Sequence, residues 1–75
     1  MKLIWVTKVK YVEGYKIALT FNDGVKKVVD LSHRLHGSMF EPLKDVERFK
    51  KFRLNSWTIE WDGDLDLAPE YLYSL

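Results

Sequence analysis

Residues 15–21 alternate large apolar side chains with small or polar ones more strictly than any other segment of the chain. Because successive side chains of a strand point to opposite faces of a sheet, this period of two predicts a strand with one buried face. The tripeptide at 22–24, Asn-Asp-Gly, suits a tight turn, and residues 25–31 resume an extended apolar pattern. The sequence therefore predicts an antiparallel β-hairpin over residues 15–31.

Two further segments have strand-like patterns. Residues 4–11 are rich in β-branched and aromatic side chains, and Lys8 and Lys10 alternate with them. Residues 54–61 alternate again, and Asn55-Ser56 makes this segment either a tight second hairpin or a bent single strand. We expect the inward side chains here to be Trp57, Ile59 and Trp61, and the outward ones to be Thr58 and Glu60.

Short helices are expected between the first hairpin and the last strand segment. Ser32 suits an N-cap and Gly37 a C-cap, which would bracket about one turn of helix. Asp45 can cap a helix over residues 46–52, and Pro69 suits the first turn of a final helix. The order of elements predicts an α+β domain. Its small antiparallel sheet would have about four to five strands, with short helices inserted between the N-terminal hairpin and the C-terminal strands.

The length and the lack of cysteine narrow the class of protein. A chain of 75 residues has room for one hydrophobic core, so we expect a single domain over residues 1–75. The absence of Cys excludes disulfides, thiolate metal sites and a cysteine nucleophile, and it favours a cytoplasmic setting. No segment approaches the roughly 20 apolar residues that a membrane span needs, and no signal peptide is evident.

The charges are divided unevenly, although the formal net charge is only +1. Residues 1–53 contain all 12 Lys and Arg together with six acids, whereas residues 54–75 contain five acids and neither Lys nor Arg. One cluster of basic side chains could form a surface that meets phosphates: Lys44, Arg48, Lys50, Lys51 and Arg53. An ordinary solvated helix face is the favoured interpretation, because the C-terminal acids could cover it. Nucleic acid is thus an alternative partner and not the favoured one.

Aromatic side chains are numerous for this length, with three Trp, four Tyr and four Phe. Phe49 and Trp61 lie on the apolar phase of their elements, so we expect them in the core. The side chains expected in excess of the core, and therefore at an interface, are Trp5, Tyr11, Tyr15, Tyr71 and Tyr73. Aromatic residues are enriched at protein interfaces, and oppositely charged segments can pair between two copies. The expected partner is another protein or a second copy of the chain.

No set of residues in the sequence predicts catalysis or a bound cofactor. His33 and His36 would share a helix face, but a zinc site needs at least a third ligand, so a polar turn is favoured. Acidic residues are frequent after residue 59, yet no spacing among them predicts two carboxylates that converge in a cleft. We therefore assign no catalytic, metal-binding or cofactor-binding residue.

A set of short motifs spans nearly the whole chain. They are Tyr15-x-Ile17-x-Leu19-x-Phe21-x-Asp23-Gly24, Val29-Asp30-Leu31, Phe40-Glu41-Pro42-Leu43 with Asp45 and Phe49, and Ile59-Glu60-Trp61-x-Gly63-x-Leu65-Asp66-Leu67-x-Pro69-Glu70-x-Leu72-Tyr73. Each motif is common, but the combination of spacings is specific. It resembles the bacterial domain-of-unknown-function family 2442.

The resemblance implies a small α+β fold that occurs alone or joined to a helix-turn-helix domain. Its members often lie beside a short partner gene, in arrangements that look like toxin–antitoxin pairs. It implies no established reaction and supplies no functional residues. We therefore expect a non-enzymatic interaction module, the antitoxin-like or regulatory partner of a small bacterial protein. The alternative is a small-ligand-binding or nucleic-acid-binding domain.

Asp62, Asp64 and Asp66 have the alternate spacing that begins a calcium-binding loop. The sixth position of that loop requires Gly and the twelfth a bidentate Glu, and this chain has Leu67 and Tyr73 there. We therefore predict that the chain does not bind calcium at physiological concentrations. Calorimetric titration with CaCl₂ checks this, and a micromolar affinity would contradict it.

Overall fold

The computed structural model describes residues 3–35, 37–62 and 65–75. In these residues six strands form two antiparallel sheets, ordered β1-β2-β3 and β4-β5-β6. The strands are β1 (Val6–Glu13), β2 (Lys16–Phe21), β3 (Lys26–Asp30), β4 (Arg53–Leu54), β5 (Ile59–Trp61) and β6 (Leu65–Asp66). The helices are the 3-10 helix η1 (Ser38–Lys44) and the α-helices α1 (Val46–Phe49) and α2 (Pro69–Ser74). The α+β class predicted from the sequence is confirmed.

The first sheet contains the predicted hairpin. β2 pairs with β3 in a regular register, and Ile17, Leu19 and Phe21 project from its buried face. At the turn, the Asp23 carboxylate accepts a hydrogen bond from the Val25 amide at 3.0 Å, and Gly24 has φ 89°, a value that glycine adopts without steric cost. β1 covers the other edge of β2, with irregular pairing at two places. The alternation of side chains in β2 thus fixes which face of this sheet meets the core.

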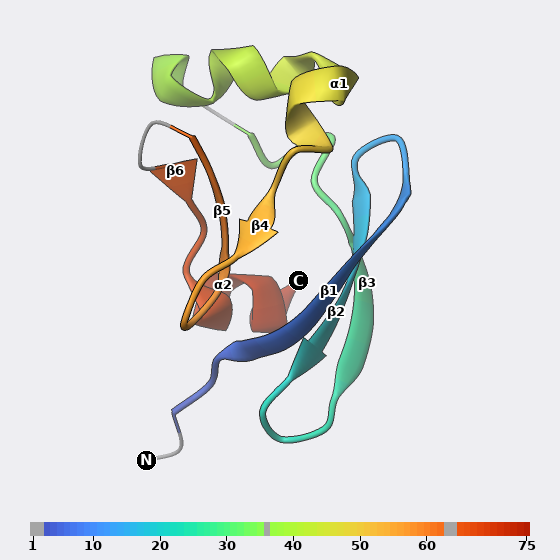
Figure 1. Ribbon diagram of the computed structural model, residues 1–75, viewed down its shortest axis with the longest axis vertical. Coiled ribbons are helices and arrows are strands. Elements are labelled where there is room, and N and C mark those ends of the chain that lie inside the picture. The colour runs from blue at the N-terminus through green and yellow to red at the C-terminus, as the bar shows by residue number, and fades with distance from the viewer. Residues whose placement is uncertain (1–2, 36, 63–64) are drawn as a thin grey trace.

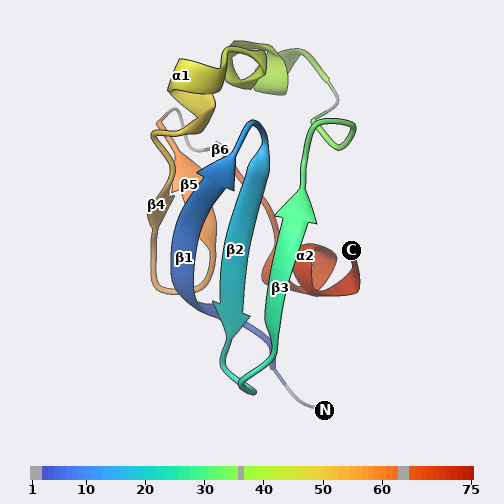
Figure 2. The same ribbon diagram turned by 90° about the vertical axis from the view of Figure 1, so that its right-hand side faces the viewer.

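A single sheet of about four to five strands is not confirmed, because the strands divide into two sheets of three. β4 lies beside β1 in Figure 2 and contacts it, but the two strands do not share a hydrogen-bonded ladder. A backbone hydrogen bond from the Val6 amide to the Trp57 carbonyl, 2.7 Å long, links the two sheets. Trp57 belongs to the turn between β4 and β5, so this bond ends at a turn and no ladder extends from it.

The helical segment between β3 and β4 covers one end of both sheets, as Figures 1 and 2 show. The Asp45 carboxylate accepts a hydrogen bond from the Glu47 amide at 3.0 Å, which confirms the predicted cap of α1. The helix ends at Phe49 and not at residue 52, because Arg53 already pairs with Glu60 in the next hairpin.

The turn of helix expected between Ser32 and Gly37 is not found in the described residues 32–35, and His36, its last residue, lies outside the described residues. The described chain makes a turn directly after β3, where the Arg34 amide donates to the Leu31 carbonyl at 3.0 Å. Gly37, with φ 90°, precedes η1 and does not end a helix. Gly37 thus has the positive φ that a C-cap glycine would have, but it stands before a helix and not after one.

Residues 54–61 form a hairpin, the first of the two alternatives, but the inward and outward assignment is wrong at its turn. Trp57 is 55% exposed, whereas Thr58 is only 4% exposed. The Asn55 carboxamide oxygen accepts hydrogen bonds from the amides of Trp57 and Thr58, at 2.7 and 2.8 Å. This side-chain turn shifts the alternation by one residue, and the buried Thr58 hydroxyl donates to the Leu67 carbonyl at 2.6 Å.

The core is one cluster between the two sheets, and it contains Phe49 and Trp61 as predicted. The Trp61 indole N–H donates to the Phe49 carbonyl at 2.9 Å, and the two ring centroids lie 5.7 Å apart. Tyr15 packs edge-on against the Phe49 ring with a centroid separation of 5.1 Å. Aromatic contacts thus connect the turn before β2, α1 and β5. Among the described residues, no helix is both long enough and apolar enough to cross a membrane.

We predict that Phe49→Ala lowers the free energy of unfolding by about 3–5 kcal/mol, because it leaves a cavity beneath three aromatic neighbours. Trp57→Ala is the matched control, since the exposed Trp57 side chain leaves no such cavity. Urea denaturation followed by circular dichroism measures both variants. A loss below about 1 kcal/mol for Phe49→Ala would contradict the position of this ring in the core.

Candidate functional site

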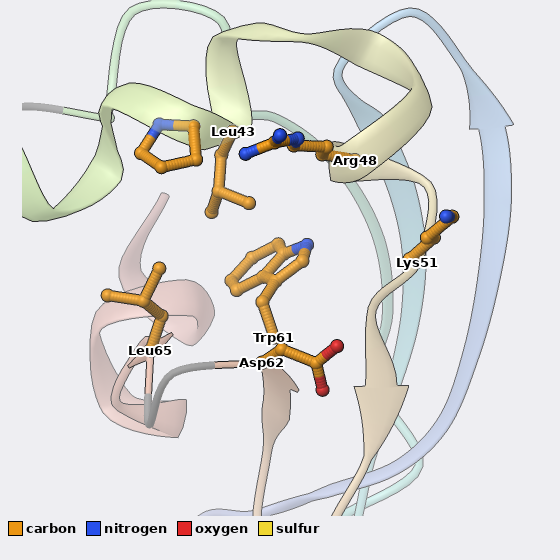
Figure 3. Close-up of a pocket in the computed structure, with 7 residues that line it drawn as sticks. Leu43, Arg48, Lys51, Trp61, Asp62 and Leu65 are labelled. Atoms are coloured by element: carbon orange, nitrogen blue, oxygen red, sulfur yellow. The ribbon is translucent and has the colours of Figure 1, made fainter.

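A pocket of about 400 Å³ lies between the helical segment and the second sheet. Figure 3 shows it as a space bounded above by η1 and α1 and below by β5 and β6. The residues that line it are Pro42, Leu43, Arg48, Lys51, Trp61, Asp62 and Leu65. They come from four elements and the adjoining turns, so only the folded chain brings them together.

The floor of the pocket is apolar and its rim is charged. Three buried apolar residues, Leu43 from η1 above and Trp61 and Leu65 from the strands below, form its inner surface, which we call the floor. The bond from the Trp61 indole to the Phe49 carbonyl fixes the orientation of this ring. Arg48 and Lys51 lie at the rim and are exposed, and in Figure 3 the Arg48 side chain extends across the pocket above Trp61. A group that enters would therefore meet two cations first and an apolar surface beneath them.

The structure divides the predicted basic surface into paired and unpaired residues. Lys44 contacts Glu41 at 3.1 Å, and Lys50 contacts Glu47 at 3.7 Å and also lies over the Tyr11 ring. Arg48 and Lys51 have no ion pair within the part of the chain that the structure describes, residues 3–35, 37–62 and 65–75.

Arg53 links the basic segment to the acidic C-terminal segment through ion pairs. Its guanidinium donates to Asp62 at 2.7 Å and lies 3.5 Å from Glu60. The hydrogen bond with Asp62 raises the pKa of Arg53 above its ordinary value. Asp62, the acid at the pocket rim, is thus already paired with a cation. The net positive charge of the rim remains with Arg48 and Lys51, which favours an anionic ligand.

The predicted interface aromatics do not gather on one surface. Tyr11, Tyr15 and Tyr73 are half-buried against the core, and each hydroxyl has a partner inside the chain. The partner of Tyr73 is the Asp23 carboxylate at 2.7 Å, and this hydrogen bond raises the pKa of Tyr73. Tyr71 is exposed on α2.

The remaining aromatic of that set, Trp5, forms an edge-to-face pair with Trp57, their ring centroids 6.0 Å apart. Trp57 is the exposed aromatic that the sequence pattern assigned to the core. The signal that could have revealed it is Asn55, whose short polar side chain commonly makes a turn with the amides two and three residues later. The pocket floor has no such local signal, because Leu43 and Leu65 read as ordinary core residues.

The described residues contain no group of three or more His, Cys, Asp or Glu side chains that could hold a metal. His33 lies on an exposed turn. His36, Gly63 and Asp64 lie outside the described residues, so neither the histidine pair nor the aspartate series is placed as a whole.

We predict that the double variant Arg48→Gln/Lys51→Gln folds and unfolds like the wild-type chain. Neither side chain has an ion pair in the described structure, and both are exposed, so their removal breaks no stabilising contact. The midpoint of urea denaturation measures this. A clear shift to lower urea would mean that the two cations support the fold.

A comparison with protein families relates the whole fold to known sequences. Neither the curated proteins nor the solved structures yield a match to this chain. The family model described as "Protein of unknown function (DUF2442)" matches residues 6–75, which include every strand and helix described above. The chain therefore belongs to the DUF2442 family of proteins of unknown function.

Proposed function

We propose that the chain is a non-enzymatic interaction module that binds an acidic segment of a protein partner in the pocket beneath Arg48. The observation that carries this proposal is the pair of cations, Arg48 and Lys51, that lack ion pairs in the described chain and lie above an apolar floor. The family resemblance adds a regulatory or antitoxin-like role for the same module, and that role rests on the resemblance alone.

The chemistry of the pocket selects its occupant. A guanidinium binds a carboxylate through two parallel hydrogen bonds, and a nearby ammonium adds a second positive charge. The floor of Leu43, Trp61 and Leu65 favours an aliphatic or aromatic side chain next to that carboxylate. The volume of about 400 Å³ suffices for one or two side chains and lies at the small end of ligand pockets. An acidic residue beside an apolar one fits both requirements.

The exposed Trp57, with the half-buried Trp5 beside it, favours a protein over a free small molecule. Trp57 is 55% exposed and is held outward by the Asn55 turn, while Trp5 packs against its edge. Tryptophan is enriched among the residues that carry the binding energy of protein interfaces. A small ligand in the pocket would leave this second surface without a role.

A small anionic ligand with an apolar body is the second candidate, because the same two cations and the same floor would hold it. Nucleic acid is less favoured as a partner of the predicted basic surface. Three of its five residues are paired with acids of the same chain, and the affinity for phosphates depends on the number of cations that are free to contact them.

Affinity capture from the native host tests the proposal. The baits are the wild-type chain, the pocket variant Arg48→Gln/Lys51→Gln and the control variant Lys44→Gln/Lys50→Gln. Both variants lose two cations from the same segment, but the control residues do not line the pocket. We expect the wild-type and control baits to retain a common protein that the pocket variant loses, and mass spectrometry identifies it.

Peptides from the captured protein then locate the contact. In ¹H–¹⁵N spectra we expect the Trp61 indole signal to move when an acidic peptide binds, and to stay when its acids are replaced by amides. Equal capture by the pocket variant would contradict the proposal. Capture that nuclease abolishes would favour nucleic acid, and a bound small molecule that is released on denaturation would favour the second candidate.

A further inference from the structure

β3 is an edge strand of the first sheet in the part of the chain that the structure describes. At one end of the strand the Phe21 amide donates to the Val25 carbonyl, and at the other the Leu31 amide donates to the Tyr15 carbonyl, both at 2.9 Å. Hydrogen-bonded residues alternate along an antiparallel pair, so the odd-numbered residues of β3 face β2. The amides and carbonyls of Lys26, Val28 and Asp30 therefore point away from β2, where no strand of the described chain pairs with them.

The side chains along this edge are complementary to the same side chains of a second copy. Lys26, Val28 and Asp30 all lie on the exposed face of the sheet, and Val28 is 62% exposed. If two copies of β3 meet in antiparallel fashion around Val28, Lys26 of each copy lies opposite Asp30 of the other, and the two Val28 side chains meet at the centre. Opposite charges and β-branched pairs that face each other across strands stabilise a sheet.

We propose that β3 pairs antiparallel with β3 of a second copy of this chain, centred on Val28. The sheet β1-β2-β3 of one copy and the same sheet of the other would then join into one continuous sheet of six strands. This contact is isologous, since the same edge serves both copies, and it closes after two. It satisfies the outward backbone groups of β3, with which no strand of the described residues pairs.

The charges of the edge support pairing between copies. Natural edge strands often carry charges that repel another strand, and a lysine that points inward is one such device. The inward lysine of β3, Lys27, is engaged inside its own chain, where its ammonium donates to the carbonyls of Tyr73 and Leu75. Hydrogen bonds from Ser32 lower the pKa of Asp30, so this carboxylate is charged at neutral pH and can pair with Lys26 of the second copy.

The contact is small, and this sets the conditions of the test. β3 has five residues, fewer than the 20–30 residues on each side that a stable interface of standard size uses. We therefore expect a dimer that dissociates at low concentration. None of the edge residues lines the pocket, so the dimer and the proposed binding of an acidic segment can fail separately.

Sedimentation equilibrium over a range of concentrations tests the pairing. We expect the apparent mass of the wild-type chain to rise from 8.9 kDa towards twice that value. Val28→Lys places two like charges opposite each other and should abolish the rise. The control is Val12→Lys, which makes the same change at an exposed valine of β1, away from the β3 edge, and should leave the rise unchanged.

A disulfide tests the register. The chain has no cysteine, so Val28→Cys would introduce its sole thiol. Residues that exchange both hydrogen bonds across antiparallel strands have Cα atoms about 5.5 Å apart, within the range that a disulfide spans. Under mild oxidation we expect Val28→Cys to form a covalent dimer much faster than Val12→Cys.

Exchange of the charges completes the test. Lys26→Asp or Asp30→Lys alone should weaken the dimer, and the two changes together should restore it. The proposal is overturned by a wild-type chain that remains at 8.9 kDa at the highest concentration, or by equal cross-linking of both cysteine variants. A dimer that persists in Val28→Lys would place the contact on another surface.

Discussion

The hydrogen bond from the Trp61 indole to the Phe49 carbonyl joins the short helix α1 to the second sheet. α1 is only one turn long, and β5 has three residues, so neither element is stable alone. Their aromatic side chains pack against each other and, through Tyr15, against the first sheet. The bond also satisfies a buried indole N–H and a helix-terminal carbonyl at once, two groups that would be costly to leave unpaired.

This arrangement places the pocket at the centre of the fold's least regular region. Trp61 belongs both to the core and to the pocket floor, so the side chain that stabilises the junction also shapes the site. The rim residue Arg48 lies in α1, and Lys51 lies just after the end of this helix. The short length of α1 thus places both beside the pocket. The proposed binding and the stability of the fold would therefore share the floor of the pocket but not its rim.

The sequence predicts the first sheet well and the second poorly, for physical reasons. Between residues 15 and 31, apolar and polar side chains alternate over a long strand and a turn signal follows it. The structure contains both the strand with its buried face and the turn. The second sheet has strands of two or three residues, too short for a period to be counted. There the Asn55 turn decides which side chains are buried, so Trp57 and Thr58 exchange the places that alternation assigns to them.

The candidate site shows the same division. The basic cluster was visible in the sequence, but the separation of Arg48 and Lys51 from Lys44, Lys50 and Arg53 depends on ion pairs. Three of these lie within one helical turn or across a hairpin, where the partner is set by the backbone path. The apolar floor brings Leu43 together with Trp61 and Leu65, which follow it by 18 and 22 positions, and no local pattern relates them.

The bond from the Val6 amide to the Trp57 carbonyl marks the outer part of the junction between the two sheets. The buried core joins the two sheets over most of their inner faces, whereas this outer part of the junction depends on the Val6–Trp57 bond and on the edge-to-face contact of Trp5 with Trp57. Local opening follows the fewest and most exposed contacts, so we expect the junction to open first at Trp57, ahead of the buried core between the sheets. Such opening can be followed at the tryptophan pair itself, because the surroundings of both indole rings change when this contact is lost.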